Sequence, residues 1–286
     1  MKLQHDCYNC IFKMAFAISR QTGKDEKRQC SVLREMLNYL ANNGDKVIPP
    51  EVTVNLHAIF ERETGIADPY REIKIKSTAL GLELLDEVRE IVNASYNPLE
   101  TAIKIAIGGN IIDYGVYPDF KLEDAKKEVL KVLDMEFDQA ALDDLIKRIK
   151  SAKQIFYVLD NCGEAVLDRL VLEQLPCKVI VGVRGKPALN DVTRVEAEES
   201  GITGYEIVDT GCSASGILLD RMPDDFKDAL YNSDLVITKG LGNYESLGDD
   251  FKEAPIYLLF RVKCPVVARY LNVPLNSVQT LGCNLK

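Results

Sequence analysis

The chain has 286 residues, of which 47% are hydrophobic and 28% are charged, a composition that allows a sizeable core and excludes disorder as the main state. Its net charge of −9 argues against non-specific nucleic-acid binding, which needs a surplus of Lys and Arg, but not against a small anionic ligand held by local cations. No uncharged apolar run approaches the roughly 18 residues that span a bilayer, and residues 1–10 lack the apolar stretch of a signal peptide. We therefore expect a cytoplasmic protein that binds neither nucleic acid nor membrane, and the sequence leaves its oligomeric state open.

The chain begins with a C-x-x-C motif, Cys7 and Cys10, the only suggestive spacing among its eight cysteines. Cytosolic thiols stay reduced, so the other cysteines are expected to pack as small hydrophobic residues. A structural zinc site needs four ligands, and the sequence has no second C-x-x-C and no H-x₃-H. A thioredoxin-like motif would follow a strand, which residues 1–4 do not offer. Three roles stay open for Cys7 and Cys10: packing, a second metal site, or redox chemistry.

The first 105 or so residues have the apolar spacing of helices. Apolar side chains recur at intervals of three and four in Ile11 to Ile18 and in Val32 to Leu40. Only Val52 to Val54 has the β-branched composition of a strand. Further helices are expected at Lys121 to Lys131 and at Asp138 to Lys150.

The pattern changes at Gln154, where short continuous apolar runs begin to alternate with helical patterns. Such runs are typical of strands buried on both faces, and the alternation predicts βαβ units with a mostly parallel sheet. The expected strands are Ile155–Leu159, Lys178–Val183, Tyr205–Val208, Leu235–Thr238 and Ile256–Phe260, and the expected helices between them include Glu164–Leu175 and Thr193–Ser200. We therefore predict an α/β protein, with a helical N-terminal region at residues 1–105 and a three-layer α/β/α domain at residues 106–286.

Polar or glycine-containing turns follow four of these strands: Asp160-Asn161, Arg184-Gly185, Lys239-Gly240, and Arg261 with Lys263. The carboxyl ends of parallel strands share one edge of the sheet, and ligands of open α/β sheets bind in the crevice outside that edge. We therefore expect these side chains to converge.

Oxygen donors stand out among the expected strand tips. Asp160, Asn161 and Asp191 offer two carboxylates and an amide, a donor set that suits Mg²⁺ or Mn²⁺ and admits Co²⁺ or Ni²⁺. The alternative is that Asp160 and Asp191 cap the helices that follow them.

Two glycine-containing segments are ambiguous by themselves. Gly240 to Tyr244 follows a strand directly, so its N–H groups suit an anion at a helix N-terminus, but a tight structural turn explains the glycines equally well. Asn110 and Asp113 have helical spacing after Gly108-Gly109, which equally suits a helix C-cap followed by a turn.

Together, the motifs resemble the metal-dependent damage-control phosphatase family, long catalogued as a domain of unknown function, in its archaeal and bacterial branch with an N-terminal C-x-x-C. The matching blocks occur in family order over nearly the whole chain: Asp6-Cys7-x-x-Cys10, Gly109-Asn110-x-x-Asp113, Asp160-Asn161-x-Gly163-Glu164, Arg184-Gly185-x-Pro187-x-x-Asn190-Asp191-x-Thr193, Lys239-Gly240-x-Gly242-Asn243-Tyr244-Glu245 and Arg261-x-Lys263.

The resemblance implies a hydrolase, a phosphatase of small phosphorylated metabolites such as sugar phosphates, that depends on Mn²⁺, Co²⁺, Ni²⁺ or Mg²⁺. By similarity, the metal ligands are Asp160, Asn161 and Asp191, which also touch the substrate. The implied phosphate-binding and catalytic groups are Lys263 together with Lys239, Gly240, Leu241, Gly242, Asn243 and Tyr244. Eukaryotic relatives carry an R-T-x-K element where this chain has Arg261-Val262-Lys263, so the resemblance assigns no role to Arg261.

We therefore predict a metal-dependent phosphomonoester hydrolase, with catalytic residues Asp160, Asn161, Asp191 and Lys263. Cys162 stands where a haloacid-dehalogenase signature would have its second Asp, which favours metal-activated water over a covalent aspartyl-phosphate. The alternative is an α/β protein that binds a phosphorylated metabolite or nucleotide at the same strand tips without hydrolysing it.

Overall fold

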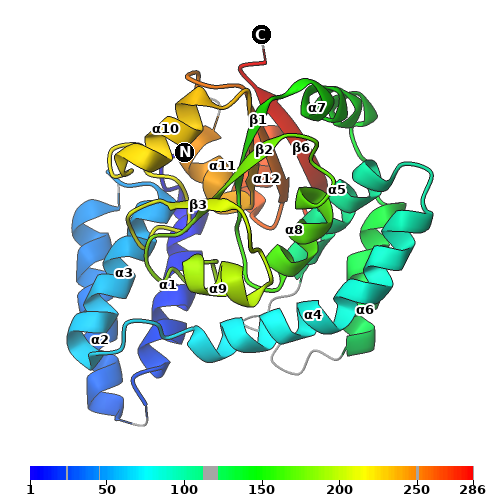
Figure 1. The fold of residues 1–286 in the computed structure, drawn as a ribbon. Helices are drawn as coiled ribbons and strands as arrows, with labels where there is room; N and C mark the ends of the chain where they lie inside the picture. Colours follow the sequence, from blue (N-terminus) through cyan, green and yellow to red (C-terminus); the bar gives the residue numbers. More distant parts are fainter. Residues whose placement is uncertain (24, 45, 112–121, 249–250, 286) are drawn as a thin grey trace.

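The computed structural model describes residues 1–23, 25–44, 46–111, 122–248 and 251–285 (Figure 1). Asp113, one of the motif residues, lies outside these ranges. Up to residue 151 the described chain is helical: α1 (His5–Arg20), α2 (Glu26–Asn43), α3 (Pro49–Thr64), α4 (Arg71–Ala94), α5 (Pro98–Gly108), the 3₁₀ turn η1 (Gly109–Ile111), α6 (Leu122–Leu130), the 3₁₀ turn η2 (Lys131–Asp134) and α7 (Gln139–Ser151).

The remainder forms a six-stranded sheet in the order β3-β2-β1-β4-β5-β6. Five strands are parallel, and β6 pairs antiparallel with β5. The strands are β1 (Gln154–Val158), β2 (Lys178–Val183), β3 (Glu206–Asp209), β4 (Leu235–Lys239), β5 (Ile256–Arg261) and β6 (Val278–Cys283). The connecting helices are α8 (Glu164–Leu172), α9 (Arg194–Glu199), α10 (Asp224–Asn232), α11 (Leu241–Leu247) and α12 (Pro265–Leu271).

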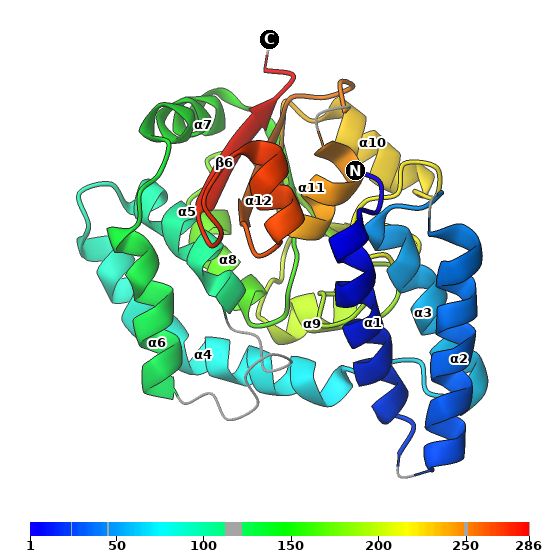
Figure 2. The same cartoon turned by 180° about the vertical axis from the view of Figure 1, so that it is seen from behind.

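Helices cover both faces of the sheet, which confirms the predicted three-layer α/β/α architecture (Figures 1 and 2). On one face, Ile155 and Tyr157 of β1 belong to the hydrophobic core that α4, α5, α7 and α8 complete. On the other face, Phe156 and Val158 pack with α10, α11 and α12. Because both faces are buried, β1 reads in the sequence as a continuous apolar run rather than an alternating one.

The helices α1, α2 and α3 form a separate hydrophobic cluster beside the sheet. Ile11 and Ile18 of α1 pack with residues of α2 and α3, and Val266 of α12 joins this cluster to the α/β layers. The expected boundary between residues 105 and 106 falls within α5, and the division of the chain into two domains at that point stays a prediction.

Two differences from the sequence-based expectations have clear causes. Val52 to Val54 is helical, because Pro49 starts α3 and Glu51 accepts a hydrogen bond from the Ile48 N–H, while Val52 and Leu56 share the buried face. The strand β6 was not predicted, since its burial alternates between buried and half-buried positions at the sheet edge and gives no continuous apolar run.

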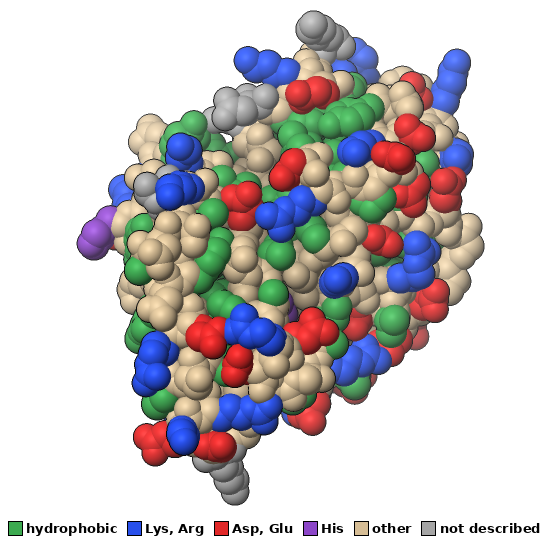
Figure 3. Space-filling model, turned by 90° about the vertical axis from the view of Figure 1, so that its left-hand side faces the viewer, with side chains coloured by type: hydrophobic (Ala, Val, Ile, Leu, Met, Phe, Trp, Pro, Cys, Tyr) green, Lys and Arg blue, Asp and Glu red, His purple; other side chains and the backbone are tan. Residues whose placement is uncertain are grey.

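The outer surface carries charges of both signs. Basic and acidic side chains are interspersed over the face that carries α2, α3 and α10, without a continuous basic patch in this view (Figure 3). No helix within the described ranges is long and apolar enough to cross a membrane.

Candidate active site

The ends of β1 and β2 bring two distant aspartates together, as the sequence predicts. Asn161 and Asp191 form an isolated antiparallel bridge. The Val192 N–H donates to the Asp160 carbonyl at 2.8 Å, and the Cys162 N–H donates to the Asn190 carbonyl at 2.9 Å. The backbone around Asp191 therefore runs alongside Asp160 and Asn161, and both aspartate side chains are buried there.

Arg184 is the centre of this arrangement, although sequence reasoning gave it no role beyond its place at a strand tip. Its side chain is only 1% exposed. Nε donates to Asp191 Oδ2 at 2.7 Å, and Nη2 lies 3.4 Å from Asp160 Oδ1. Nη1 donates to Asn243 Oδ1 at 3.1 Å, and Nη2 also donates to the Ser215 carbonyl at 3.2 Å. One guanidinium thus fixes the orientation of both aspartates.

A second set of polar side chains holds Asp160 from the α5 side. Asn110 Nδ2, in η1, donates to Asp160 Oδ2 at 3.2 Å and to Glu164 Oε2 at 2.6 Å. Asn161 Nδ2 donates to the same two carboxylates, at 2.6 and 3.1 Å. The sequence left the role of Asn110 undecided, and the structure places it in this network.

Lys239 lies beneath the strand tips, fully buried. Its Nζ donates to Glu164 Oε1 at 2.6 Å, to Asp168 Oδ1 at 2.9 Å and to the Ala106 carbonyl at 2.9 Å. Burial alone would lower the pKa of this ammonium, but Asp168 and Glu164 raise it above its usual value. These bonds occupy the three N–H groups of Lys239, so its contacts are with the protein interior.

The network carries more negative than positive groups. Its buried charged side chains are the four carboxylates of Asp160, Glu164, Asp168 and Asp191 and the two cations of Arg184 and Lys239. Burial raises the pKa of the Asp160 carboxyl well above its usual value, and the charges of Asp191 and Glu164 raise it further. Burial likewise raises the pKa of Asp168 to about 6. The site therefore favours an additional positive charge.

The turn after β4 packs directly against Asp160. Gly240 has φ +86°, and a Cβ built there would lie 2.0 Å from Asp160 Oδ2, so only glycine fits. The Gly240 N–H donates to the Leu259 carbonyl, and α11 then begins at Leu241 without a side-chain cap. A Cβ on Gly242 would lie 1.8 Å from the Ser215 carbonyl, which gives that glycine a packing role.

The side chains of this turn face inward. Asn243 is fully buried and donates to the Lys239 carbonyl at 2.7 Å while it accepts from Arg184. The Tyr244 ring is buried and stacks on Phe260, with 4.9 Å between ring centroids. What the segment can offer a ligand is therefore its backbone.

Lys263 stands at the rim of the site. Its side chain is exposed, and Nζ donates to the Asn110 carbonyl at 2.5 Å. The strands β4 and β5 are neighbours, so Lys263 and the turn after β4 occupy the same part of the carboxyl edge. Lys239 and Lys263 were both predicted to bind the phosphate. The structure buries Lys239 inside the site and leaves Lys263 exposed at its rim.

Comparisons with known proteins identify the family and support the fold. A family model described as the damage-control phosphatase ARMT1-like domain matches residues 3–278. The chain belongs to this family. A damage-control phosphatase of Archaeoglobus fulgidus is 31% identical, with 96% of each chain covered, and one of Pyrococcus horikoshii is 30% identical over the same shares. A crystal structure of a DUF89 family protein from Pyrococcus horikoshii superposes with a TM-score of 0.84, at 27% identity, over 98% of this chain and 99% of that one.

The donor chemistry of this damage-control phosphatase family member fits a hard divalent cation. Asp160, Asn161 and Asp191 carry only oxygen acceptors and lie together, with a surplus of negative charge around them. Within the described part of the chain, no three His, Cys, Asp or Glu side chains form a metal-binding group. Two carboxylates and an amide would therefore leave the remaining coordination positions to water and substrate, as is common for Mg²⁺.

The C-x-x-C motif lies in the first two turns of α1. Cys7 is buried and its Sγ accepts a hydrogen bond from the Gln4 N–H at 3.4 Å, whereas Cys10 is exposed, and both thiols are free. Burial raises the pKa of the Cys7 thiol. The contacts of Cys7 are those of a residue that packs in the α1–α3 cluster, and a second metal site at these cysteines stays a prediction.

Proposed function

We propose that this protein is a metal-dependent phosphatase that hydrolyses phosphomonoesters of small metabolites. The observation that carries the proposal is the convergence of Asp160, Asn161 and Asp191 at the carboxyl edge of the sheet, inside a buried network with more carboxylates than cations. Family membership supports phosphatase activity, and the proposal adds the substrate class and the metal to it.

Asp160, Asn161 and Asp191 would hold the ion, with Mn²⁺, Co²⁺, Ni²⁺ or Mg²⁺ as candidates. A divalent cation held there would act as a Lewis acid on a phosphoryl oxygen and would lower the pKa of a bound water. Arg184 is a positioning residue in this proposal, because its bonds to Asp160 and Asp191 fix both carboxylates before any ligand arrives.

The phosphate would lie between the metal ligands and Lys263. The exposed ammonium of Lys263 can reach a ligand at the rim, and the first turn of α11, which has no side-chain cap, could offer its backbone N–H groups to the same phosphate. Gly240 allows this turn to approach Asp160. The buried ammonium of Lys239 donates a hydrogen bond to Glu164 and so fixes that carboxylate beneath the site. Positive groups at the rim offset the charge of the transferred phosphoryl group.

The test is hydrolysis of p-nitrophenyl phosphate and of a panel of sugar phosphates, after chelation and re-addition of each metal in turn. We expect turnover that chelator abolishes and that at least one of the four metals restores. If no substrate of the panel is turned over in a chelator-sensitive way, the proposal is wrong and the non-catalytic binding alternative is favoured.

A further inference from the structure

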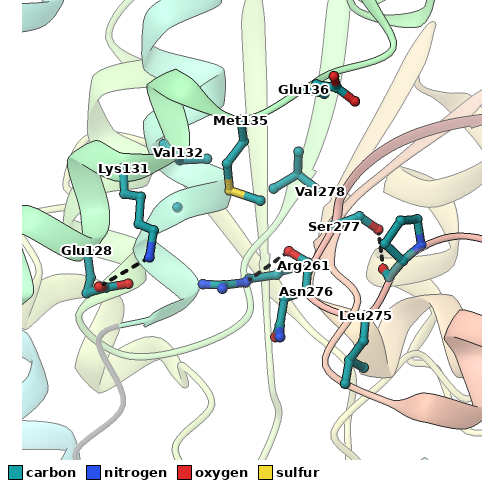
Figure 4. A pocket seen from close by; sticks show the side chains of 12 residues that line it. Glu128, Lys131, Val132, Met135, Glu136, Arg261, Leu275, Asn276, Ser277 and Val278 are labelled. Atoms are coloured by element: carbon teal, nitrogen blue, oxygen red, sulfur yellow. Dashed lines mark hydrogen bonds and ion pairs between the residues drawn. The ribbon is translucent and has the colours of Figure 1, made fainter.

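A pocket of about 360 Å³ opens beside the candidate active site, between η2, the end of α5 and the turn that leads into β6 (Figure 4). Its lining residues are Gly108, Glu128, Lys131, Val132, Met135, Glu136, Arg261, Pro274, Leu275, Asn276, Ser277 and Val278. None of these residues takes part in the network around Asp160 and Asp191, and the function proposed above does not yet use the pocket.

The pocket and the site share a wall. Gly108, which lines the pocket, directly precedes η1, where Asn110 bonds Asp160 and accepts from Lys263. Arg261 is the last residue of β5, and the Lys263 N–H donates to its carbonyl at 3.0 Å. The pocket therefore borders Lys263, within reach of the other end of a small molecule whose phosphate contacts Lys263.

Arg261 is the charged group best placed to meet that other end. Its Nε donates to the Asn276 carbonyl at 3.3 Å, which anchors the side chain. Its two Nη groups bond no residue of the described chain, and Figure 4 shows the guanidinium reaching into the pocket on the side of Lys131. An anchored guanidinium whose two Nη groups bond no described residue matches the planar oxygens of a carboxylate or a phosphate.

The rest of the lining combines apolar and polar surface, and it includes the carboxylates of Glu128 and Glu136 as well as Lys131. Val132, Met135 and Val278 supply apolar surface, and the Asn276 side chain adds a polar group. The Lys131 ammonium lies 3.6 Å from Glu128 and its side chain is 65% exposed, so this pair is weak and screened by solvent.

We propose that this pocket binds the end of the substrate remote from the scissile phosphate, and that Arg261 holds a second anionic group there. The preferred substrates are then phosphomonoesters that carry a carboxylate or a further phosphate. This inference rests on the proposed phosphatase function and adds the substrate class to it.

The test compares substrates that differ in the second anion. Glucose 6-phosphate and 6-phosphogluconate differ by a carboxylate, and fructose 6-phosphate and fructose 1,6-bisphosphate differ by a phosphate. We expect kcat/KM of the native enzyme to be about tenfold or more higher for the doubly charged member of at least one pair, the scale of a hydrogen bond to a charged group. The pair that shows the preference identifies the anion as carboxylate or phosphate.

The Arg261→Met variant should raise KM for the doubly charged substrate by about tenfold and leave glucose 6-phosphate and fructose 6-phosphate within about twofold. Arg89→Met, which removes one positive charge at a surface ion pair with Glu173, is the matched control and should retain the preference. Equal loss on both members of a pair, or no preference in the native enzyme, would overturn the proposal.

Calorimetric titration separates this inference from the proposed function. We expect native protein loaded with Mn²⁺ to bind 6-phosphogluconate or fructose 1,6-bisphosphate about tenfold more tightly than the singly charged partner, and Arg261→Met to lose that difference, even if neither compound is hydrolysed. Hydrolysis with no binding difference would contradict the Arg261 site alone.

Discussion

The strand-tip site and the Cys7–Cys10 segment both have metal-binding residue types, but the fold places these residues in different surroundings. At the strand tips, Asp160 and Asp191 come from separate βα turns and meet through backbone pairing, in a buried network with surplus negative charge. Cys7 and Cys10 lie in one helical turn, where Cys7 is buried and Cys10 is exposed. The difference teaches that short motif spacing alone is weaker evidence for a metal site than distant acids that the sheet topology brings together.

The largest effect is expected when the buried cation beneath the strand tips is removed from its carboxylate partners. Lys239→Met leaves Glu164 and Asp168 buried without their cation, so we expect a loss of about 3–5 kcal/mol in the free energy of unfolding. Urea unfolding followed by circular dichroism measures this loss. Combining Lys239→Met with Asp168→Asn should recover part of it, and an unchanged unfolding midpoint in the single variant would show that the network does not depend on Lys239.

The next largest effect concerns the proposed metal ligands. Asp160→Ala and Asp191→Ala should each lower metal-dependent turnover by about a hundredfold or more, because each removes a proposed ligand of the ion that would stabilise transition-state charge. Asp209→Ala is the matched control, since Asp209 also ends a strand but lies outside the network, and we expect its rate to stay within about twofold. Near-normal turnover in a folded Asp191→Ala variant would remove Asp191 from the site.

The next prediction concerns Lys263, which lies at the rim of the site, whereas Lys239 is buried beneath it. Lys263→Met should raise KM and lower kcat/KM by about tenfold or more, because a hydrogen bond to a charged group contributes about 1.5–3 kcal/mol. Its activation by metal should change little, since its Nζ bonds only the Asn110 carbonyl among the described residues. Steady-state kinetics at several metal concentrations distinguish the two effects. An unchanged kcat/KM would contradict the phosphate role of Lys263.

His57 of α3 connects the N-terminal helices to the strand-tip site. Its Nε2 accepts the Leu189 N–H at 3.0 Å, two residues before Asp191, and burial lowers the pKa of its imidazole to about 4. Since the unfolded chain then binds a proton between about pH 6.5 and pH 4 that the folded chain does not, folding stability should fall as the pH drops through this range.

His57→Gln keeps an acceptor for Leu189 but removes the titration. We expect its free energy of unfolding to lose on the order of 1–2 kcal/mol less than that of the native protein between pH 7 and pH 5. Urea unfolding at each pH measures the difference. Parallel pH profiles for the two proteins would show that His57 is not buried in its neutral form.

The smallest effect is expected at the cysteines. Cys7→Ser and Cys10→Ser should each leave turnover within about twofold, and Cys7→Ser should lower stability by about 1 kcal/mol because it places a hydroxyl in the α1–α3 cluster. If either cysteine variant lost activity while Asp160→Ala kept it, the functional site would lie at the cysteines and thiol chemistry would be indicated.

The sequence predicted the parallel sheet and the strand tips because buried strands read as continuous apolar runs. It did not predict the edge strand β6, because the apolar pattern of that strand is mixed. It also did not predict how deeply each strand-tip side chain is buried. Lys239 and Lys263 follow neighbouring strands, but Lys239 is the last residue of β4 and faces the α5 layer, whereas Lys263 lies beyond β5 on a turn. The central role of Arg184 depends on contacts with Asp191, Asn243 and Ser215 that only the tertiary fold defines.

The most direct test of the account is to count Mn²⁺ bound per chain, by electron paramagnetic resonance, in the native protein, in Asp160→Ala and in Cys7→Ser. We predict one Mn²⁺ in the native protein and in Cys7→Ser, and a large loss of binding in Asp160→Ala, because the strand-tip carboxylates provide the site. Full Mn²⁺ binding in a folded Asp160→Ala variant, or its loss in Cys7→Ser, would contradict a metal site at the carboxyl edge of the sheet.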